Sequence, residues 1–136
     1  MILVDTGYFV ALLRSRDNLH ARAAAWMGHL SDEPLLTLEH VLWELVNGFS
    51  KPVDRPIVHE IIDDVRRSAN WEIVRTSENL FEEGLGFHRR SADKEWSLTD
   101  CIAFVVMRER GIKQALTYDH HFEQAGFEAL LRRDPP

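Results

Sequence analysis

The sequence has only one cysteine, Cys101, among its 136 residues. A lone cysteine excludes an intrachain disulfide and is typical of a protein in a reducing compartment. Long apolar runs are also missing, since none approaches the ~18–20 residues that a membrane-spanning helix requires. The first residues lack the basic, apolar and small-residue order of a secretory signal. These absences predict a cytoplasmic protein that does not span a membrane.

Positive charge is scarce as well. Lysine and arginine number 16 against 22 aspartates and glutamates, which gives a net charge of −6. Proteins that coat nucleic acid bind chiefly to its phosphates and are usually basic, so this composition argues against non-specific coating. It is compatible with an enzyme that gathers carboxylates around metal ions beside a small basic rim. Candidates for that rim are Arg14, Arg16, Lys51, Arg55, Arg89, Arg90 and Lys94, although each is equally explained as solvated surface charge.

Short apolar runs alternate with amphipathic segments along the whole chain. The runs predict strands at 2–4, 35–38, 71–74 and 115–118, with a short fifth at 128–131. Helical spacing predicts helices near 8–14, 18–30, 39–49, 57–68, 77–90 and 98–110, although Gly84 and Gly86 weaken the fifth. Strands separated by helices are typical of a parallel sheet covered on both faces. We therefore expect one α/β domain over residues 1–134, an α/β/α sandwich around four to five mostly parallel strands.

Two aspartates stand where strands of this sheet are expected to end. Asp5 directly follows the run Ile2-Leu3-Val4, and Asp119 directly follows the predicted strand at 115–118. Sites in open parallel sheets lie beyond the carboxyl ends of the strands. If the two strands are neighbours, both carboxylates point into the same crevice.

Two more acids come from predicted helices. Glu44 lies at the margin of the apolar face of the helix at 39–49, where a carboxylate can reach inward and stay hydrated. Asp100 lies in the first turn of the most apolar helix, where the backbone amides favour negative charge. The joint placement of Asp5, Glu44, Asp100 and Asp119 predicts a single acidic site.

Each acid also has a simpler structural interpretation. The two aspartates that follow strands could form turns, and Glu44 could be an ordinary acid on a helix flank. Asp100 stands three residues after Ser97, the spacing of a capping box. Asp93 is expected to be a loop acid, close enough to Asp100 in sequence to be a reserve ligand.

Four carboxylates in one site repel one another, because like charges raise each other's pKa. A hard divalent cation removes that cost. Mg²⁺ and Mn²⁺ prefer oxygen ligands in octahedral geometry, completed by waters and substrate phosphates. Such a centre suits hydrolysis of phosphodiester bonds by a metal-activated water, without a serine, cysteine or histidine nucleophile. The expected cofactor is therefore Mg²⁺ or Mn²⁺.

The acids lie within four segments that together are similar to a known family. The segments are Ile2-Leu3-Val4-Asp5-Thr6, residues 37–47 with Val41, Glu44 and Asn47, Trp96-Ser97-Leu98-Thr99-Asp100-Cys101, and Leu116-Thr117-Tyr118-Asp119-His120-His121-Phe122 followed by Gly126-Phe127. In this order and at this chain length, they resemble the PIN-domain ribonucleases, specifically the VapC-type toxins of bacterial and archaeal toxin–antitoxin pairs.

The resemblance implies a metal-dependent endoribonuclease that cleaves tRNA, rRNA or mRNA. It also implies a homodimer and inhibition by a small VapB-like antitoxin. By the same resemblance, Asp5, Glu44, Asp100 and Asp119 are the metal-binding and catalytic acids. Thr6 and Thr99 would support them through hydrogen bonds.

Other residues have competing interpretations. His120 and His121 beside Asp119 suggest a zinc site, but the ligand spacing and the cysteines of such sites are lacking. Trp43 and Trp96, near acids in sequence, are the tryptophans most suited to stacking on bases, whereas Cys101 is expected in the core.

Three other functions compete with a toxin nuclease. A phosphatase, phosphotransferase or receiver domain with an aspartate nucleophile usually has a second acid beside the first, and Asp5 is followed by Thr6 and Gly7. A non-catalytic α/β module that binds RNA or protein would not need all four acids. A PIN-like RNA-processing nuclease without an antitoxin is the nearest alternative.

Overall fold

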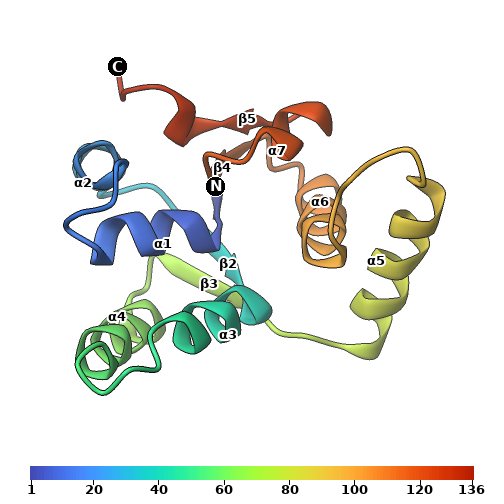
Figure 1. The fold of residues 1–136 in the computed structure, drawn as a ribbon. Coiled ribbons are helices and arrows are strands. Elements are labelled where there is room, and N and C mark those ends of the chain that lie inside the picture. Colours follow the sequence, from blue (N-terminus) through green and yellow to red (C-terminus); the bar gives the residue numbers. More distant parts are fainter.

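The computed structural model describes all 136 residues and has a five-stranded, all-parallel sheet at its centre (Figure 1). The strand order is β3-β2-β1-β4-β5, and every neighbouring pair is parallel. The strands are β1 (Ile2–Val4), β2 (Leu35–Leu38), β3 (Trp71–Val74), β4 (Gln114–Leu116) and β5 (Glu128–Ala129). The predicted α/β fold is confirmed, and β1 lies in the middle of the sheet.

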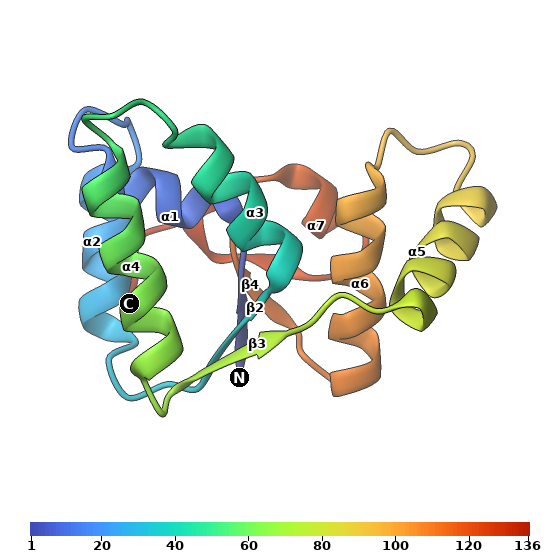
Figure 2. The same cartoon turned by 90° about the horizontal axis from the view of Figure 1, so that it is seen from below.

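Helices cover both faces of the sheet, as Figures 1 and 2 show. The helices α1, α2 and α4 lie on one side, and α6 lies on the other with α5 packed outside it. The helices are α1 (Thr6–Leu13), α2 (His20–His29), α3 (Glu39–Gly48), α4 (Arg55–Arg67), α5 (Glu78–Arg90), α6 (Leu98–Arg110) and α7 (His120–Gln124), followed by a 3₁₀ turn at Leu130–Arg132. None of these helices is long and apolar enough to cross a membrane.

The most apolar elements form the core. All three residues of β1 are buried, as expected of a central strand that has helices on both faces. Seven consecutive residues of α6, from Cys101 to Met107, are buried, so this helix is enclosed on every side. It starts at the capping residue Ser97 and ends at Gly111, whose φ of 67° a side chain would disfavour.

Two strands are shorter than the apolar runs suggested. The strand predicted at 115–118 is observed at Gln114–Leu116, so Thr117 and Tyr118 lie beyond its end. The fifth strand covers only Glu128–Ala129 before the 3₁₀ turn begins. An apolar run indicates which residues are buried, but it does not indicate where the backbone stops forming the hydrogen bonds of the sheet.

The helix at 78–90 forms in spite of its two glycines. At Gly84 a Cβ atom would collide with Cγ1 of Ile102, so the glycine allows α5 and α6 to approach each other closely. The helix also has a conventional start, because the Ser77 hydroxyl accepts a hydrogen bond from the Leu80 backbone N–H. Gly84 therefore has a packing role that its low helix propensity conceals.

Candidate metal centre

The first pair of acids lies at the carboxyl ends of neighbouring strands. β1 pairs directly with β4, and the Asp5 backbone N–H donates to the Leu116 carbonyl at 3.2 Å. Asp119 lies two residues farther from its strand than the sequence suggested, because β4 ends at Leu116. There it caps α7, with its Oδ1 accepting a 2.9 Å hydrogen bond from the His121 backbone N–H. The turn-forming role and the site position of Asp119 therefore coexist.

The second pair comes from the helices on either side of this edge. Glu44 lies on the exposed side of α3, and its Oε2 accepts a 2.9 Å hydrogen bond from the Thr6 hydroxyl. Asp100 forms the predicted capping box with Ser97: its Oδ2 accepts from the Ser97 N–H at 3.1 Å, and the Ser97 hydroxyl accepts from its N–H. The capping box holds the Asp100 side chain at the N-terminus of α6.

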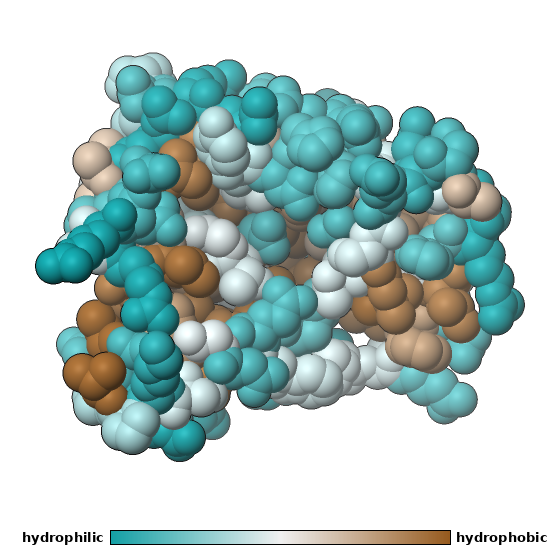
Figure 3. Space-filling view, in the orientation of Figure 1, coloured by the Kyte–Doolittle hydropathy of each residue, from teal (hydrophilic) through white to brown (hydrophobic).

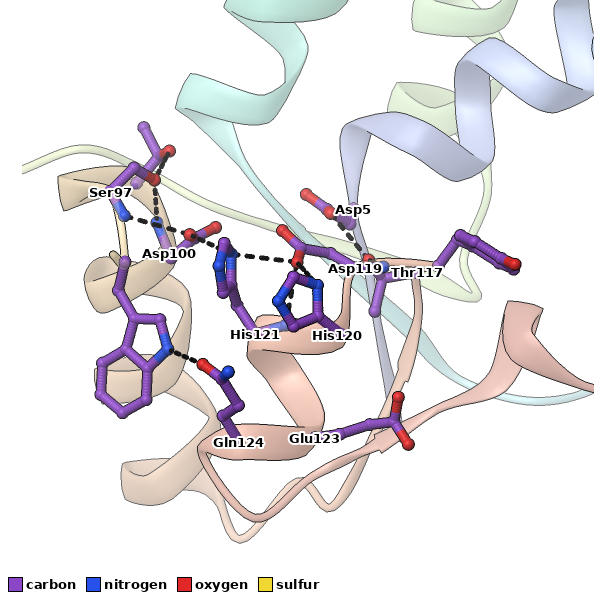
Figure 4. Close-up of polar contacts among 12 residues, drawn as sticks. Asp5, Ser97, Asp100, Thr117, Asp119, His120, His121, Glu123 and Gln124 are labelled. Atoms are coloured by element: carbon purple, nitrogen blue, oxygen red, sulfur yellow. Dashed lines mark hydrogen bonds and ion pairs between the residues drawn. The ribbon is translucent and has the colours of Figure 1, made fainter. Parts of the chain in front are cut away.

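Three of the acids surround one small recess. Asp5, Glu44 and Asp100 line it together with His40 and Thr99, and its volume is about 10 Å³. That is roughly the smallest space able to hold one water-sized species. Asp119 lies outside the lining but beside Asp100, with the ring of His121 between the two carboxylates (Figure 4). The structure thus brings all four predicted acids to one edge of the sheet.

The electrostatics of the recess show how crowded the negative charges are. Burial raises the pKa of Asp5 to about 6, even though the Thr6 backbone N–H and the Thr117 hydroxyl lower it, and the charges of Asp100 and Glu44 raise it further. Burial also raises the pKa of Asp100, and the charge of Asp119 adds to that effect. No lysine or arginine forms an ion pair with any of the four acids. The four side chains offer carboxylate oxygens that are only partly hydrated, and no lysine or arginine offsets their negative charge. Such a set of ligands fits a hard divalent cation.

Two further residues support the acids: Thr117, which the sequence did not single out, and His121, which it suggested only as part of a zinc site. The buried Thr117 hydroxyl donates to Oδ2 of Asp5 at 3.0 Å, and its own oxygen accepts from the Asp119 backbone N–H at 3.1 Å. His121 lies against both Asp100 and Asp119. A threonine near the end of a predicted buried strand, two positions before an aspartate, was a usable signal for Thr117.

The other residues predicted to assist the acids differ in whether they contact one. Thr6 contacts an acid as expected, whereas the Thr99 hydroxyl bonds to the Ser97 hydroxyl at 2.9 Å although Thr99 lines the recess. Asp93 is outside the recess and forms an ion pair with Lys94 at 3.3 Å. The structure therefore gives no sign of Asp93 as a reserve ligand.

The two tryptophans proposed for base stacking differ in exposure. Trp43 on α3 is 56% exposed, beside Glu44. Trp96 is buried, packs edge-on against Phe104 and donates its Nε1–H to Gln124 at 3.1 Å. Trp96 is therefore a core residue. The sequence did not reveal this, because it shows the neighbours of a residue along the chain but not the side chains that cover its ring in the fold.

The candidate basic rim is partly neutralised. Arg14 pairs with Asp54 at 3.2 Å, and Lys94 pairs with Asp93. Arg55 donates to the Ser50 carbonyl. Among the seven rim candidates, those that are exposed and form no ion pair are Arg16, Lys51, Arg55, Arg89 and Arg90.

Comparison with known proteins identifies the fold and the family together. The profile of the PIN domain matches residues 2–128. The chain belongs to the PIN-domain family. Over 134 residues it is 31% identical to the 23S rRNA-specific endonuclease VapC20 of Mycobacterium tuberculosis, from strains CDC 1551 / Oshkosh and ATCC 25618 / H37Rv, with 93% of this chain and 95% of that protein covered.

Solved structures support the same assignment. The crystal structure of M. tuberculosis VapC20, a toxin that cleaves the sarcin–ricin loop, superposes with a TM-score of 0.80 and 27% identity, covering 93% of this chain and 96% of that chain. FitAcB from Neisseria gonorrhoeae has a TM-score of 0.66 at 20% identity, with 95% of each chain covered, and shares the fold. This PIN protein is therefore a homologue of VapC-type endonuclease toxins.

Proposed function

We propose that this chain is the toxin of a toxin–antitoxin pair and cleaves RNA at a centre of Mg²⁺ or Mn²⁺ held by Asp5, Glu44, Asp100 and Asp119. The observation that carries the proposal is the recess lined by Asp5, Glu44 and Asp100, in which burial and mutual repulsion raise the pKa of Asp5 and of Asp100. A divalent cation offsets that repulsion. The family assignment and the likeness to VapC20 agree with this chemistry.

The metal, when bound, supplies a water of lowered pKa and a positive charge beside the reacting phosphate. The chain's own residues orient the ligands. Each acid is oriented by a hydrogen bond from the chain: the Thr117 hydroxyl donates to Asp5, the Thr6 hydroxyl to Glu44, the Ser97 N–H to Asp100, and the His121 N–H to Asp119. Such outer hydrogen bonds set both the direction and the basicity of metal ligands.

The substrate proposed is RNA, with ribosomal RNA as the first to test, because VapC20 is specific for 23S rRNA. Transfer and messenger RNA belong to the same proposal. The exposed cations Arg16, Lys51, Arg55, Arg89 and Arg90 offer contacts to backbone phosphates in an otherwise acidic protein.

Protein partners are part of the proposal. Large hydrophobic side chains reach the surface at Met27, Trp43, Val53 and Phe81, each at least 47% exposed. The space-filling view shows hydrophobic surface beside α4 and beside α5 (Figure 3). Such surface supports a homodimer and a VapB-like antitoxin, both acting in the cytoplasm. Static light scattering of the protein alone and of the protein co-expressed with the gene next to its own tests both partners.

The decisive experiment incubates the purified, partner-free protein with total RNA in Mg²⁺, Mn²⁺ or EDTA. Asp100→Asn is the test variant, and Asp93→Asn is the matched control because Asp93 lies outside the recess. We expect discrete cleavage that needs metal, disappears in Asp100→Asn and persists in Asp93→Asn. Equal cleavage in EDTA and in Asp100→Asn would refute the assignment of the acids. Metal binding without cleavage of any RNA would favour a non-catalytic binding module.

A further inference from the structure

The ring of His121 lies between two carboxylates of the acidic site, those of Asp100 and Asp119. Its Nδ1 is 3.0 Å from Oδ1 of Asp119 and 3.7 Å from Oδ2 of Asp100. Figure 4 shows the ring projecting from the start of α7 toward Asp100 on α6. Only 19% of the side chain is exposed, so the ring is held between the two elements and is not free in solvent.

The Nδ1 atom of His121 has no hydrogen-bond partner although it is buried. The nearest oxygen, Oδ1 of Asp119, already accepts the backbone N–H of His121 itself at 2.9 Å, and its position does not satisfy the ring nitrogen. A buried polar atom without a partner destabilises the fold, because it has lost its hydrogen bonds to water. An unpaired, buried nitrogen of this kind indicates that a partner absent from the chain itself binds there when the protein functions.

We propose that His121 is a direct nitrogen ligand of the metal ion bound by Asp100 and Asp119. Ligands at ~2.1 Å in an octahedron are about 3.0 Å apart when adjacent, which is the separation between Nδ1 and the Asp119 oxygen. The inference rests on the metal-binding half of the proposed function and is independent of the RNA substrate.

His120 offers a comparison within the same cluster. Its Nδ1 is 3.8 Å from Oδ1 of Asp119, and the ligand atoms of Asp119, His120 and His121 all lie within 4.8 Å of one another. The side chain of His120 is 60% exposed, however, against 19% for that of His121. We therefore assign the ligand role to His121 alone.

A nitrogen ligand changes which metal the site prefers. Mg²⁺ binds oxygen almost exclusively, whereas first-row transition ions accept imidazole nitrogen. His121 thus biases the centre toward Mn²⁺ or another transition ion over Mg²⁺. A site made of the four carboxylates alone would lack this bias.

The test is electron spin echo envelope modulation spectroscopy of the full chain loaded with Mn²⁺. A coordinated imidazole nitrogen modulates the decay of the Mn²⁺ spin echo at ¹⁴N frequencies. We expect this signal in the wild type and in His120→Gln, and its loss in His121→Gln. Isothermal titration should show that His121→Gln weakens Mn²⁺ binding by about tenfold or more, since even loss of an outer partner costs 10–100-fold, with a smaller change for Mg²⁺. Circular dichroism checks folding, and His121→Asn replaces the glutamine variant if that variant does not fold.

The outcomes separate this inference from the proposed function. Absence of ¹⁴N modulation in wild-type protein that binds Mn²⁺, or its persistence in His121→Gln, would overturn the ligand assignment while leaving the nuclease proposal intact. Loss of the signal in His120→Gln but not in His121→Gln would show that His120 is the ligand, and would also overturn the assignment of His121. A ¹⁴N signal in a protein that cleaves no RNA would uphold the ligand and contradict the nuclease.

Discussion

The hydroxyl of Thr117 donates a 3.0 Å hydrogen bond to Oδ2 of Asp5, and so joins the end of β4 to the acid that follows β1. The two residues are 112 positions apart in sequence. The same hydroxyl accepts the Asp119 backbone N–H, so one buried threonine orients two of the four acids. Pre-orientation of ligands in this way lowers the cost of assembling a metal centre.

Replacement of Thr117 by valine tests this role. Thr117→Val leaves a partly buried carboxylate without its donor, which should lower the free energy of unfolding by about 1–3 kcal/mol. Loss of the donor should also raise the pKa of Asp5 further, so the acidic limb of the pH–activity profile should move to higher pH. Urea unfolding and kcat/KM between pH 5 and 8 measure the two effects.

Thr37→Val is the matched control for that variant. Thr37 is also buried, and its hydroxyl donates to the Val4 carbonyl at 2.9 Å without contacting an acid. We expect a similar loss of stability with an unchanged pH profile. If the two variants shift the profile equally, Thr117 has no specific effect on Asp5.

Asp5 should destabilise the metal-free protein at neutral pH. Its pKa is about 6 when folded against the ordinary value of 3.8, so the folded state binds the proton more tightly. This contribution to stability is fully present below about pH 4 and is lost as pH rises through about 6, so ionisation of Asp5 costs the metal-free fold roughly 3 kcal/mol by pH 7. Without metal, Asp5→Asn should therefore be more stable than wild type at pH 7.5, and the difference should shrink at pH 4.5.

Metal should reverse that difference. Saturating Mg²⁺ or Mn²⁺ stabilises only the folded state, and it should raise the Tm of the wild type more than that of Asp5→Asn. Scanning calorimetry with and without EDTA measures the change. A variant that gains as much from metal as the wild type would show that Asp5 is not a ligand.

The two glycines of α5 should respond oppositely to alanine. Gly84→Ala places a methyl group against Ile102, and overpacking of this kind costs about 1–3 kcal/mol, more than the gain in helix propensity of up to about 1 kcal/mol. At Gly86 the nearest atom is the flexible guanidinium end of Arg90, 3.3 Å away, so Gly86→Ala should stabilise by about 0.5–1 kcal/mol. Equal effects of the two substitutions on the midpoint of urea unfolding would contradict the close approach of α5 and α6.

Trp96 and Trp43 should differ sharply in their contribution to stability, because one ring is buried and the other is exposed. Trp96→Ala empties a buried aromatic site and should cost about 3–5 kcal/mol. Trp43→Ala removes an exposed side chain, so the free energy of unfolding should change by no more than about 0.5 kcal/mol. Chemical denaturation measures both values, and a large loss in Trp43→Ala would show that its ring is needed for packing in the chain.

The sequence predicted the alternation of strands and helices because periodicity and capping are local properties. The helix at 98–110 was identifiable from its apolar run, from Ser97 at its start and from Gly111 at its end. The exact end of β4 was not predictable, because it depends on pairing with β1 and β5. The ring of Trp96 was misjudged for the same reason: its burial comes from Phe87 and Phe104, which other parts of the fold supply.

The sequence alone determined which acids follow strands (Asp5 and Asp119), which one begins a helix (Asp100) and which one borders the apolar face of a helix (Glu44). These local positions made the four acids candidates for one site. Only the tertiary structure decided the order β3-β2-β1-β4-β5, which places β1 beside β4 and brings Asp5 next to Thr117. It also decided that His121 meets Asp100. Local patterns report the conformation and burial of a segment, whereas contacts between distant residues follow from how the whole chain buries its apolar faces.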